Sequence, residues 1–466
     1  MLTVSEEKFL DDVFLTLKNY ILETESSKNV AHYSAPMELK KSIPELTQEG
    51  IAFDELLNEL KGILNKSVRT VHPLFLNQLF GGFHVAAWAG EVASVLLNPT
   101  MATYEIAPVI TIIEKKIISE LISMLGFQRG EGIMVTGGSN ANLLSMLCAR
   151  TDYNPSIRQT GFEHNRFRIY VSSEAHYSFD KAANITGIGT QNLVLVPSNE
   201  KGEMLSLELE KIIKADLREG YVPIMVGATL GTTVLGAFDY LPEIARICDR
   251  YKIWFHVDAA WGGGALFSKS LKHLFKGIEF ADSVTLDAHK TLGTPMVTSF
   301  FLTKHAGILK NTNRGGGAEY LFHEYDNSEW DTGTYSLQCG RRADALKLWL
   351  LWRSVGTKGI IERTEHLIEL ATYSAEKIKK DSRFKLYHFN YLNVCFQVVP
   401  RSVENINEFT LNVRSRLVKE GKAMVNYAQR PDGTIFFRLV FPNHLTQKTD
   451  IDHLLDLILE TAQKLS

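Results

Sequence analysis

With 466 residues, the chain is too long for one ordinary hydrophobic core, so a large domain and a smaller one are expected. Its composition is that of a soluble globular protein, and a formal net charge of −3 argues against the clustered basic surface of a nucleic-acid-binding protein. The four cysteines form no CxxC pair, so neither a zinc site nor a disulfide framework is predicted. The first residues lack the pattern of a signal peptide and no apolar run is long enough to span a bilayer, so we expect a cytoplasmic protein without a membrane partner.

The beginning of the chain is predicted to be helical and to carry little chemistry. Residues 1 to about 70 show the apolar spacing of amphipathic helices, with a linker near residues 33–44. Residues 72–82 then place polar groups among aromatic side chains beside a glycine pair. This pattern fits a buried loop with hydrogen-bonded amides as well as a functional segment. Residues 98–116 are expected to form a loop that enters a helix.

A glycine-rich turn follows the apolar run at residues 133–135. The run reaches Gly137 and Gly138, after which Ser139 leads into a helix near residues 143–149. Small residues at a helix start present backbone amides to an anion, which favours a phosphate-binding turn. The lysine of a P-loop and the spaced glycines of a dinucleotide fold are both missing, and a plain glycine-rich turn remains the alternative.

A histidine follows the next short strand. The run at residues 169–173 leads to His176, which would lie beyond the end of that strand. A lone histidine is more often structural, but at an edge shared with a cofactor its flat ring could stack on the cofactor. The histidines of the chain show no HExxH or comparable spacing, so no metal site is predicted.

Two further strands end in residues suited to binding. Residues 222–233 begin as an apolar run and close with small hydroxyl residues as far as Thr233. A helix with Pro242 in its first turn is predicted at residues 241–251. The next strand, near residues 253–257, is apolar as expected for a strand buried on both faces, and Asp258 follows it before three glycines.

Residues 281–290 deliver a lysine to the end of a strand. Val284 and Leu286 alternate with polar residues, and turn formers at residues 291–295 stop this pattern directly after Lys290. A solvated surface cation beside a turn is one interpretation. The other is an amine held in a partly dry site, where a lysine can attack a carbonyl group to form a Schiff base.

The alternation of strands and helices predicts a parallel sheet, whose ligands bind beyond the carboxyl ends of the strands. Thr233, Asp258 and Lys290 would meet along that edge. This set matches the needs of pyridoxal phosphate, which requires a lysine for its aldehyde, a carboxylate that keeps its pyridine nitrogen protonated, and amides with hydroxyls for its phosphate. The residues therefore favour a pyridoxal phosphate enzyme.

The chain after Lys290 predicts a long loop and then a second domain. Residues 311–335 are polar, glycine-rich and aromatic, as lids often are. Helices are expected at residues 345–354 and from about 360, with strands at 394–399 and 434–440. Arg438 lies inside the last strand, where a buried arginine needs an anionic partner, either an internal carboxylate or the carboxylate of a substrate.

Taken together, these stretches resemble the group II pyridoxal-phosphate decarboxylases of fold type I. The matching stretches are residues 72–79, 103–108, 137–150, 175–182, 229–233, 256–264, 282–290 and 338–344. The resemblance implies an α/β fold with a mainly parallel seven-stranded sheet flanked by helices, and a smaller α+β C-terminal domain. We expect an N-terminal helical segment at residues 1–85 that interlocks a dimer, a cofactor-binding domain at 86–358 and a C-terminal domain at 359–466.

The family pattern also implies roles for single residues. By this resemblance Lys290 is the Schiff-base lysine, Asp258 the partner of the pyridine nitrogen, and His176 the residue that stacks on the ring. The further cofactor contacts implied are Gly138, Ser139 and His289 at the phosphate, and Thr233 near the ring.

Tyr320 matches the mobile-loop tyrosine that is implicated in protonating the substrate carbon after carbon dioxide leaves. Members of the family are dimers in which this loop reaches the partner's site, so a homodimer with active sites at its interface is implied. The presence of Tyr320 favours decarboxylation over oxidative deamination or transamination. The joint presence of Lys290, Asp258 and His176 argues against a catalytically silent scaffold.

The resemblance also bears on the substrate. Arg438 matches the carboxylate-binding arginine of the glutamate and cysteine sulfinate branch, and Gln78 and Phe80 are expected to contact the substrate. Where glutamate decarboxylases have a serine after Asn-Gln-Leu, this chain has Phe80, like cysteine sulfinate and aspartate decarboxylases, and a bulky ring would shorten the pocket. We therefore expect aspartate or cysteine sulfinate before glutamate, with diaminobutyrate, aromatic or aliphatic amino acids as the alternative. One departure from the family pattern is Asp287, where Asn is commoner.

Overall fold

The computed structural model describes residues 2–316, 320–322, 326–400, 403–430 and 432–465. They form two compact units. The larger unit contains residues 83–368 with 390–392, and the smaller unit contains residues 1–82, 369–389 and 393–466.

The larger unit is built on a seven-stranded sheet with the strand order β2-β8-β7-β6-β5-β3-β4. Its strands are β2 (Glu131–Val135), β3 (Phe167–Ser172), β4 (Leu193–Val196), β5 (Val222–Thr229), β6 (Trp254–Ala259), β7 (Ser283–Asp287) and β8 (Ser299–Thr303). The pairs β3–β4, β3–β5, β5–β6 and β6–β7 are parallel, and β8 runs antiparallel to both β2 and β7. The mainly parallel seven-stranded sheet expected from the sequence is thus confirmed.

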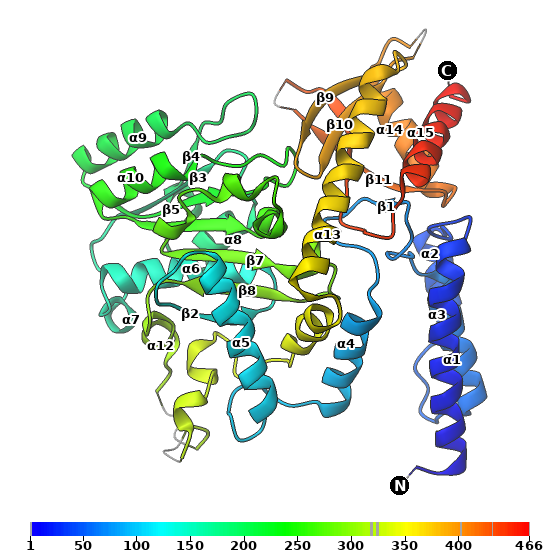
Figure 1. Cartoon of the computed structure of the whole chain (residues 1–466), viewed down its shortest axis with the longest axis horizontal. Helices are drawn as coiled ribbons and strands as arrows, with labels where there is room; N and C mark the ends of the chain where they lie inside the picture. Colours follow the sequence, from blue (N-terminus) through cyan, green and yellow to red (C-terminus); the bar gives the residue numbers. More distant parts are fainter. Residues whose placement is uncertain (1, 317–319, 323–325, 401–402, 431, 466) are drawn as a thin grey trace. The chain divides into compact units, whose positions relative to one another are not determined.

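Helices surround this sheet (Figure 1), and α6, α9 and α10 contact its central strands. The helices assigned to this unit are α4 (Val85–Leu97), α5 (Pro108–Met124), α6 (Gly138–Tyr153), α7 (Ile157–Thr160), α8 (Ser178–Ile185), α9 (Ser206–Arg218), α10 (Leu241–Tyr251), α11 (Ala288–Thr291) and α12 (Ile308–Asn313). Short 3₁₀ helices lie at Thr190–Asn192, Gly262–Phe267, Lys272–Phe275, Ile278–Phe280, Ser328–Trp330 and Gly333–Tyr335. Because helices cover the sheet, β6 and β7 are buried along their whole length, although Ser283, Thr285 and Asp287 of β7 are polar.

Helix α10 shows how the sequence sets local structure in this unit. Pro242 occupies the first turn, where its missing N–H costs nothing, and Lys252 ends the helix in a left-handed conformation with φ 55°. The apolar residues between them are buried, among them Ile244 and Cys248. The helix predicted at residues 241–251 is confirmed.

The smaller unit contains a five-stranded sheet with the order β1-β11-β12-β10-β9. Its strands are β1 (Phe75–Leu76), β9 (Phe384–Asn390), β10 (Asn393–Val398), β11 (Met424–Gln429) and β12 (Ile435–Val440). Its helices are α1 (Val4–Ser26), α2 (Pro36–Ser42), α3 (Phe53–Lys66), α14 (Ile406–Lys419) and α15 (Lys448–Gln463). Strand β1 pairs with β11, so a short segment of the N-terminal region completes a sheet formed by the C-terminal region.

Helix α13 (Ala345–Lys380) belongs in part to each unit. Gly356 interrupts it with φ 66° and ψ 173°, close to the point where the sequence predicts one helix to end and another to begin. Such a positive φ is accessible to glycine without steric cost.

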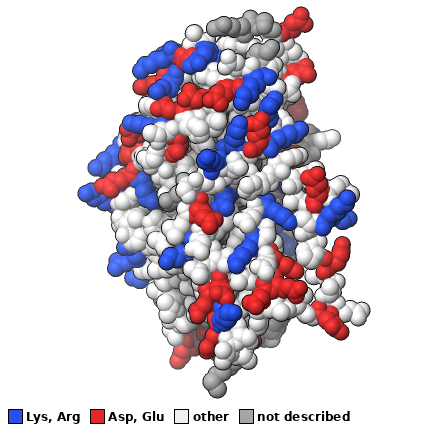
Figure 2. Space-filling model, turned by 90° about the vertical axis from the view of Figure 1, so that its right-hand side faces the viewer, with Lys and Arg blue, Asp and Glu red and all other residues white. Residues whose placement is uncertain are grey.

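The surface carries charges of both signs. On the face drawn in Figure 2, the basic and acidic side chains of the described residues are interspersed rather than gathered by sign. Within the same described part of the chain, no helix is both long and apolar enough to cross a bilayer.

Candidate active site

The candidate site lies in the larger unit, beyond the carboxyl ends of adjacent parallel strands. The register places Thr229 of β5 beside Asp258 of β6, and Asp258 beside Thr285 of β7. Helix α11 begins directly after β7 and carries Lys290. The sequence prediction that Asp258 and Lys290 share one edge of the sheet is therefore confirmed by the strand order.

The carboxylate of Asp258 is held from two sides. Its Oδ1 accepts a hydrogen bond from the amide of Ala260 at 3.0 Å, and its Oδ2 accepts one from Nδ2 of Asn142 at 2.8 Å. Asp258 is buried, and a carboxylate oxygen can accept more than one hydrogen bond. The arrangement fixes the plane of this carboxylate and leaves it able to accept a further donor.

Asn142 belongs to a buried polar chain that runs across β6 and β7. The indole N–H of Trp254 donates to Oγ of Ser283 at 2.8 Å, and Oγ of Ser283 lies 2.8 Å from Nδ1 of His256. Nε2 of His256 lies 3.1 Å from Oδ1 of Asn142. If His256 is neutral, accepts from Ser283 and donates to Asn142, every group in this chain has a hydrogen-bond partner. Burial favours this neutral form, because it lowers the pKa of His256 to about 3. This chain therefore orients the amide that holds Asp258.

His176 lies four residues beyond the end of β3 and is partly buried. Its Nδ1 accepts a hydrogen bond from the amide of Ser178 at 3.2 Å, which fixes the ring at the start of α8. Burial lowers the pKa of His176, and the charges of Asp258 and Lys290 act on it in opposite directions. The structure therefore brings His176, Asp258 and Lys290 into one electrostatic environment, as the sequence predicts.

Lys290 of α11 points toward the carboxylate of Asp287, the last residue of β7. Its Nζ lies 3.1 Å from Oδ2 of Asp287, and the lysine side chain is 19% exposed whereas that of Asp287 is 2% exposed. The site thus contains an amine that remains accessible to a small molecule. The interpretation of Lys290 as a freely solvated surface cation is wrong, because most of its side chain is buried.

The turn before α6 contributes backbone amides. Gly137 has φ 107°, a conformation that favours glycine, and the helix starts at Gly138. A Cβ atom at Gly138 would lie 2.9 Å from Oδ2 of Asp287 and 3.1 Å from Cβ of Ala260, so only glycine fits there. The first N–H groups of a helix have no partner within it, and Ser139 lies exposed beside them. This turn can bind a phosphate group.

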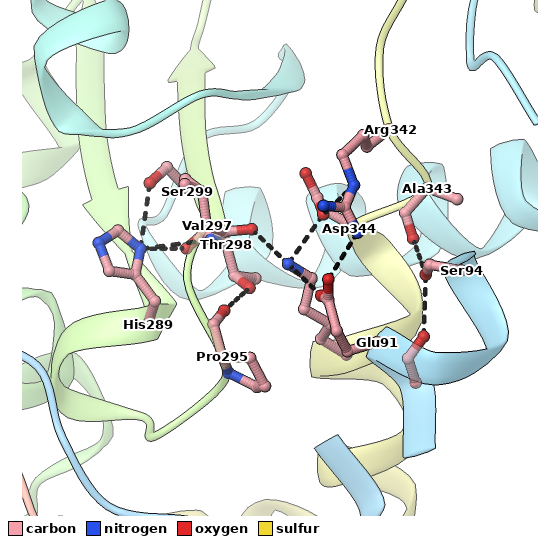
Figure 3. Close-up of polar contacts among 12 residues, drawn as sticks. Glu91, Ser94, His289, Pro295, Val297, Thr298, Ser299, Arg342, Ala343 and Asp344 are labelled. Carbon is pink, nitrogen blue, oxygen red and sulfur yellow. Dashed lines mark hydrogen bonds and ion pairs between the residues drawn. The ribbon is translucent and has the colours of Figure 1, made fainter. Parts of the chain in front are cut away.

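His289 lies behind Lys290 and is held by the chain that follows α11. Its Nδ1 lies 3.2 Å from the carbonyl oxygen of Thr298 and 3.3 Å from Oγ of Ser299 (Figure 3). Its Nε2 lies 3.9 Å from Oδ2 of Asp287. Burial lowers the pKa of His289, and the Asp287 carboxylate opposes that effect.

A buried ion cluster supports the same segment. Nζ of Lys347 is 2.9 Å from the carbonyl oxygen of Val297, 2.7 Å from Oε2 of Glu91 and 2.8 Å from Oδ1 of Asp344. The Lys347 side chain is fully buried, and Figure 3 shows Val297, Glu91 and Asp344 around it. The cluster connects helix α4 and the start of α13 to residues that hold His289.

Thr233 lies in a turn that follows β5. The turn is closed by hydrogen bonds from the amides of Gly231 and Thr232 to the carbonyl oxygen of Ala237, at 2.8 and 3.0 Å. Asp239 accepts from the amide of Thr229 at 2.7 Å and so ties the turn to the strand. Thr233 is partly buried, and its contact with the ring stays a prediction.

Tyr320 lies in a turn of the long loop after α12, and its side chain is 82% exposed. Within the described residues, no hydrogen bond links Tyr320 to Lys290 or His176 of the same chain. Ala318 and Glu319, which belong to the same family motif, lie outside the described residues.

The base of this loop is anchored by polar contacts. Asp331 accepts from the amide of Tyr104 at 2.7 Å, and Arg341 forms a buried ion pair with Glu114 at 2.7 Å. The segment that resembles the acidic-substrate branch, residues 103–108, therefore contacts the loop that carries Tyr320.

The smaller unit brings together the residues predicted to contact the substrate. Arg438 of β12 is buried, and its Nη2 donates to the carbonyl oxygen of Asn77 at 2.9 Å. Gln78 follows directly and is exposed, and the ring of Phe80 packs at 5.9 Å from that of Phe75. Burial lowers the pKa of Arg438, so its guanidinium is partly desolvated.

The sequence did not predict a role for Asn142, although this residue lies in the same glycine-rich stretch as Ser139. The only signal was its position in the first turns of α6, where a polar side chain facing the sheet must have partners. Its partner Asp258 is 116 residues away, and no local pattern reveals a contact of that kind.

The site residues fit pyridoxal phosphate, because they supply an accessible amine, an oriented carboxylate and helix-terminal amides at one sheet edge. This fold and this site define a pyridoxal-phosphate-dependent decarboxylase of fold type I. The pyridoxal-dependent decarboxylase conserved domain matches residues 36–399, and the chain belongs to that family. It is an amino acid decarboxylase that uses pyridoxal phosphate, as the sequence predicts.

Among its relatives, the acidic amino acid decarboxylase GADL1 of Xenopus tropicalis is 38% identical over 97% of this chain and 92% of the relative. The cysteine sulfinic acid decarboxylase of Mus musculus is 38% identical over 97% of this chain and 95% of the relative. The crystal structure of mouse CSAD superposes with a TM-score of 0.95 at 36% identity, covering 98% of each chain. The expected similarity to the acidic branch is confirmed.

Proposed function

We propose that this enzyme decarboxylates a short acidic L-amino acid, with aspartate and cysteine sulfinate preferred over glutamate. The observation that carries this proposal is the buried Arg438, whose guanidinium contacts the backbone directly before Gln78. A desolvated arginine binds a carboxylate or sulfinate more strongly than a solvated one does. The names of the relatives, an acidic amino acid decarboxylase and a cysteine sulfinic acid decarboxylase, support the same substrate class.

The proposed roles of the catalytic residues follow from their surroundings. Pyridoxal phosphate, when bound, supplies an aldehyde for the substrate amine and a ring that accepts the electron pair left as carbon dioxide departs. Asp258, held by Asn142 and Ala260, keeps the ring nitrogen protonated. Lys290 would hold the cofactor through its aldehyde until the substrate amine replaces the lysine there. His176 would pack on the ring.

The phosphate is proposed to bind at Gly138, Ser139 and His289. Thr233 would lie near the ring. Tyr320 is proposed to deliver the proton to the substrate carbon. An exposed position on a loop whose base is anchored allows this tyrosine to reach the site of a second chain.

We propose a homodimer as the working form. Large apolar side chains are exposed along one stretch of the larger unit, namely Val95, Leu96, Leu97, Ile106 and Val109. Leu96 is 83% exposed, and an exposed apolar patch larger than a few hundred Å² is a mark of interaction surfaces. The cytoplasmic location expected from the sequence stays a prediction, which imaging of a tagged chain would test.

The first test is carbon dioxide release from aspartate, cysteine sulfinate, glutamate, diaminobutyrate and aromatic amino acids. We expect release from one of the first two, and Arg438→Met should lower kcat/KM for that substrate at least about thirtyfold, since a buried charged contact contributes roughly 2 kcal/mol or more. Retained yellow colour of the variant would show that the cofactor still binds.

Arg438→Lys is the matched control, because it keeps the charge and loses the planar two-pronged contact, and its loss should be intermediate. Release from none of the acidic substrates, with the cofactor bound, would contradict the proposed substrate class. It would direct the search to diaminobutyrate, aromatic or aliphatic amino acids and to aldehyde or keto-acid products.

A further inference from the structure

The carboxylate of Asp287 lies beside the turn that is proposed to bind the phosphate group. Its Oδ2 is 2.9 Å from the position of a Cβ atom on Gly138, the first residue of α6, and its Oδ1 is 3.3 Å from the same position. The side chain is almost completely buried, and Oδ1 has no hydrogen-bond partner among the described residues. The N-terminus of α6, a position that favours anions, therefore already has the buried carboxylate of Asp287 beside it.

In the chain without ligand, the negative charge of Asp287 is balanced. Lys290 of α11 lies 3.1 Å from Oδ2, and His289 of the same helix lies 3.9 Å from it. The charges of Asp258 in β6 and of Asp287 also act on His176, which precedes α8, and both favour its protonated form. Burial raises the pKa of Asp287 and the neighbouring Lys290 lowers it, and the pKa lies below its usual value.

A bound phosphate group changes this balance. It adds up to two negative charges to a site from which water is largely excluded, and Lys290 alone cannot compensate three. A carboxylate and a phosphate in contact favour the uptake of a proton by the groups around them.

His289 is the nearest group able to accept that proton. Its Nδ1 lies 3.2 Å from the carbonyl oxygen of Thr298, which can accept from a protonated ring, and 3.3 Å from the amide of Thr298, which donates to an unprotonated Nδ1. The Asp287 carboxylate lies 3.9 Å from Nε2 and favours the charged ring through its own charge rather than through a hydrogen bond. Burial and the charges of Lys290 and Lys347 oppose protonation of His289, and the Asp287 charge favours it.

We propose that the Asp287–His289 pair takes up a proton when the phosphate group of the cofactor binds, so that cofactor affinity falls as the pH rises. This inference rests on the proposed phosphate site and is independent of the substrate. An asparagine at position 287 would remove both the repulsion and the proton uptake.

The test uses pyridoxamine 5′-phosphate, which carries the phosphate and the ring but has no aldehyde to react with Lys290. Titration of the cofactor-free protein in buffers of different ionisation enthalpy measures by calorimetry both the affinity and the protons taken up. For the unchanged protein we expect net proton uptake and an affinity that falls by roughly three- to tenfold per pH unit above neutrality, the tenfold limit being one proton.

Asp287→Asn should take up fewer protons and bind at least about tenfold tighter at pH 8.5. The affinity of this variant should then depend on pH only through the ionisation of pyridoxamine 5′-phosphate itself. Asp282→Asn is the matched control, because Asp282 lies at the opposite end of β7 and pairs with Lys304. This control should behave like the unchanged protein. Equal proton uptake by the unchanged protein and Asp287→Asn, or weaker binding by Asp287→Asn at every pH, would overturn the proposal.

A second titration, with inorganic phosphate as competitor, separates this inference from the wider site assignment. Competition that is stronger in Asp287→Asn than in the unchanged protein supports it. If phosphate competes equally in both proteins, Asp287 does not face the phosphate and the inference is wrong. Neither titration involves decarboxylation, so the substrate proposal stands or falls separately.

Discussion

At the scale of single residues, the site depends on charges that are few and closely held. Lys290 has one carboxylate beside it in Asp287, and Asp258 is oriented by one amide side chain and one backbone amide. Because each contact is buried or nearly so, the loss of one partner leaves the other without compensation.

Lys290→Ala should abolish both turnover and the visible absorbance of lysine-bound cofactor, since no other amine occupies its place at the end of β7. Absorbance spectra and carbon dioxide release from the purified variant provide the measurement. Lys304→Ala, at the opposite end of β7 beside Asp282, should retain both properties. An active, still-coloured Lys290→Ala protein would refute the assignment of the Schiff-base lysine.

Phe80→Ser should shift selectivity toward the longer substrate. The Phe80 ring packs near Phe75 and is expected to shorten the pocket, so its removal should raise kcat/KM for glutamate relative to cysteine sulfinate by about tenfold. Competition assays with both substrates measure this ratio directly. Phe80→Leu keeps an apolar side chain and should change the ratio less, and an unchanged ratio in both variants would exclude Phe80 as a selectivity residue.

At the scale of elements, the strands β6 and β7 do more than carry site residues to an edge. The chain of contacts from Trp254 through Ser283 and His256 to Asn142 runs along β6 and ends on Asp258. Its order requires a neutral His256, and the burial that lowers its pKa to about 3 provides that state. The polar core of the sheet is consequently sensitive to acid.

His256 should make the protein less stable as the pH falls. In the unfolded chain a histidine has a pKa near 6.5. Between about pH 6.5 and 3, His256 is therefore protonated in the unfolded state and neutral in the folded state. The linked loss in the free energy of unfolding is about 2 kcal/mol at pH 5 relative to pH 8.

Urea unfolding without added cofactor, at pH 8 and pH 5, measures this difference. His256→Gln should reduce the difference by about that amount, whereas His453→Gln at an exposed position should not. Identical pH dependence for all three proteins would show that His256 does not carry the effect.

The elements were predictable from sequence to the extent that their patterns are local. The apolar runs ending at Asp258 and Lys290 predicted parallel strands with a shared edge, and α10 was predicted from Pro242 and its apolar spacing. Contacts between distant residues were beyond such patterns. Asn142 on Asp258 and Lys347 on Val297 join residues whose separation in sequence carries no periodic signal.

The position of Arg438 was predictable and its immediate partner was not. A charged residue within an apolar strand indicated a special site, and the structure shows its Nη2 donating to a backbone carbonyl, that of Asn77. This pairing depends on strand β1, two residues long and too short to be predicted by alternation.

At the scale of the whole molecule, the larger unit presents an apolar surface formed by Val95, Leu96, Leu97, Ile106 and Val109. If this surface is the homodimer interface, Leu96→Asp should shift the protein toward the monomer, because a carboxylate buried without a partner is costly. Light scattering after size exclusion gives the mass of each species. Leu207→Asp is a control at another exposed leucine in the same unit and should remain dimeric. A Leu96→Asp protein that stays dimeric would place the interface elsewhere.

Helix α4 takes part in both the exposed apolar region and the buried ion cluster. Its last residues Val95, Leu96 and Leu97 are exposed, whereas Glu91, one turn earlier, contacts Lys347. Lys347 also contacts Asp344 and the carbonyl group of Val297. Helix α4 would consequently support both dimer assembly and cofactor retention. Dilution that separates the chains should also loosen the segment behind His289, so that bleaching of the yellow colour would accompany dissociation and would reverse when the chains reassociate.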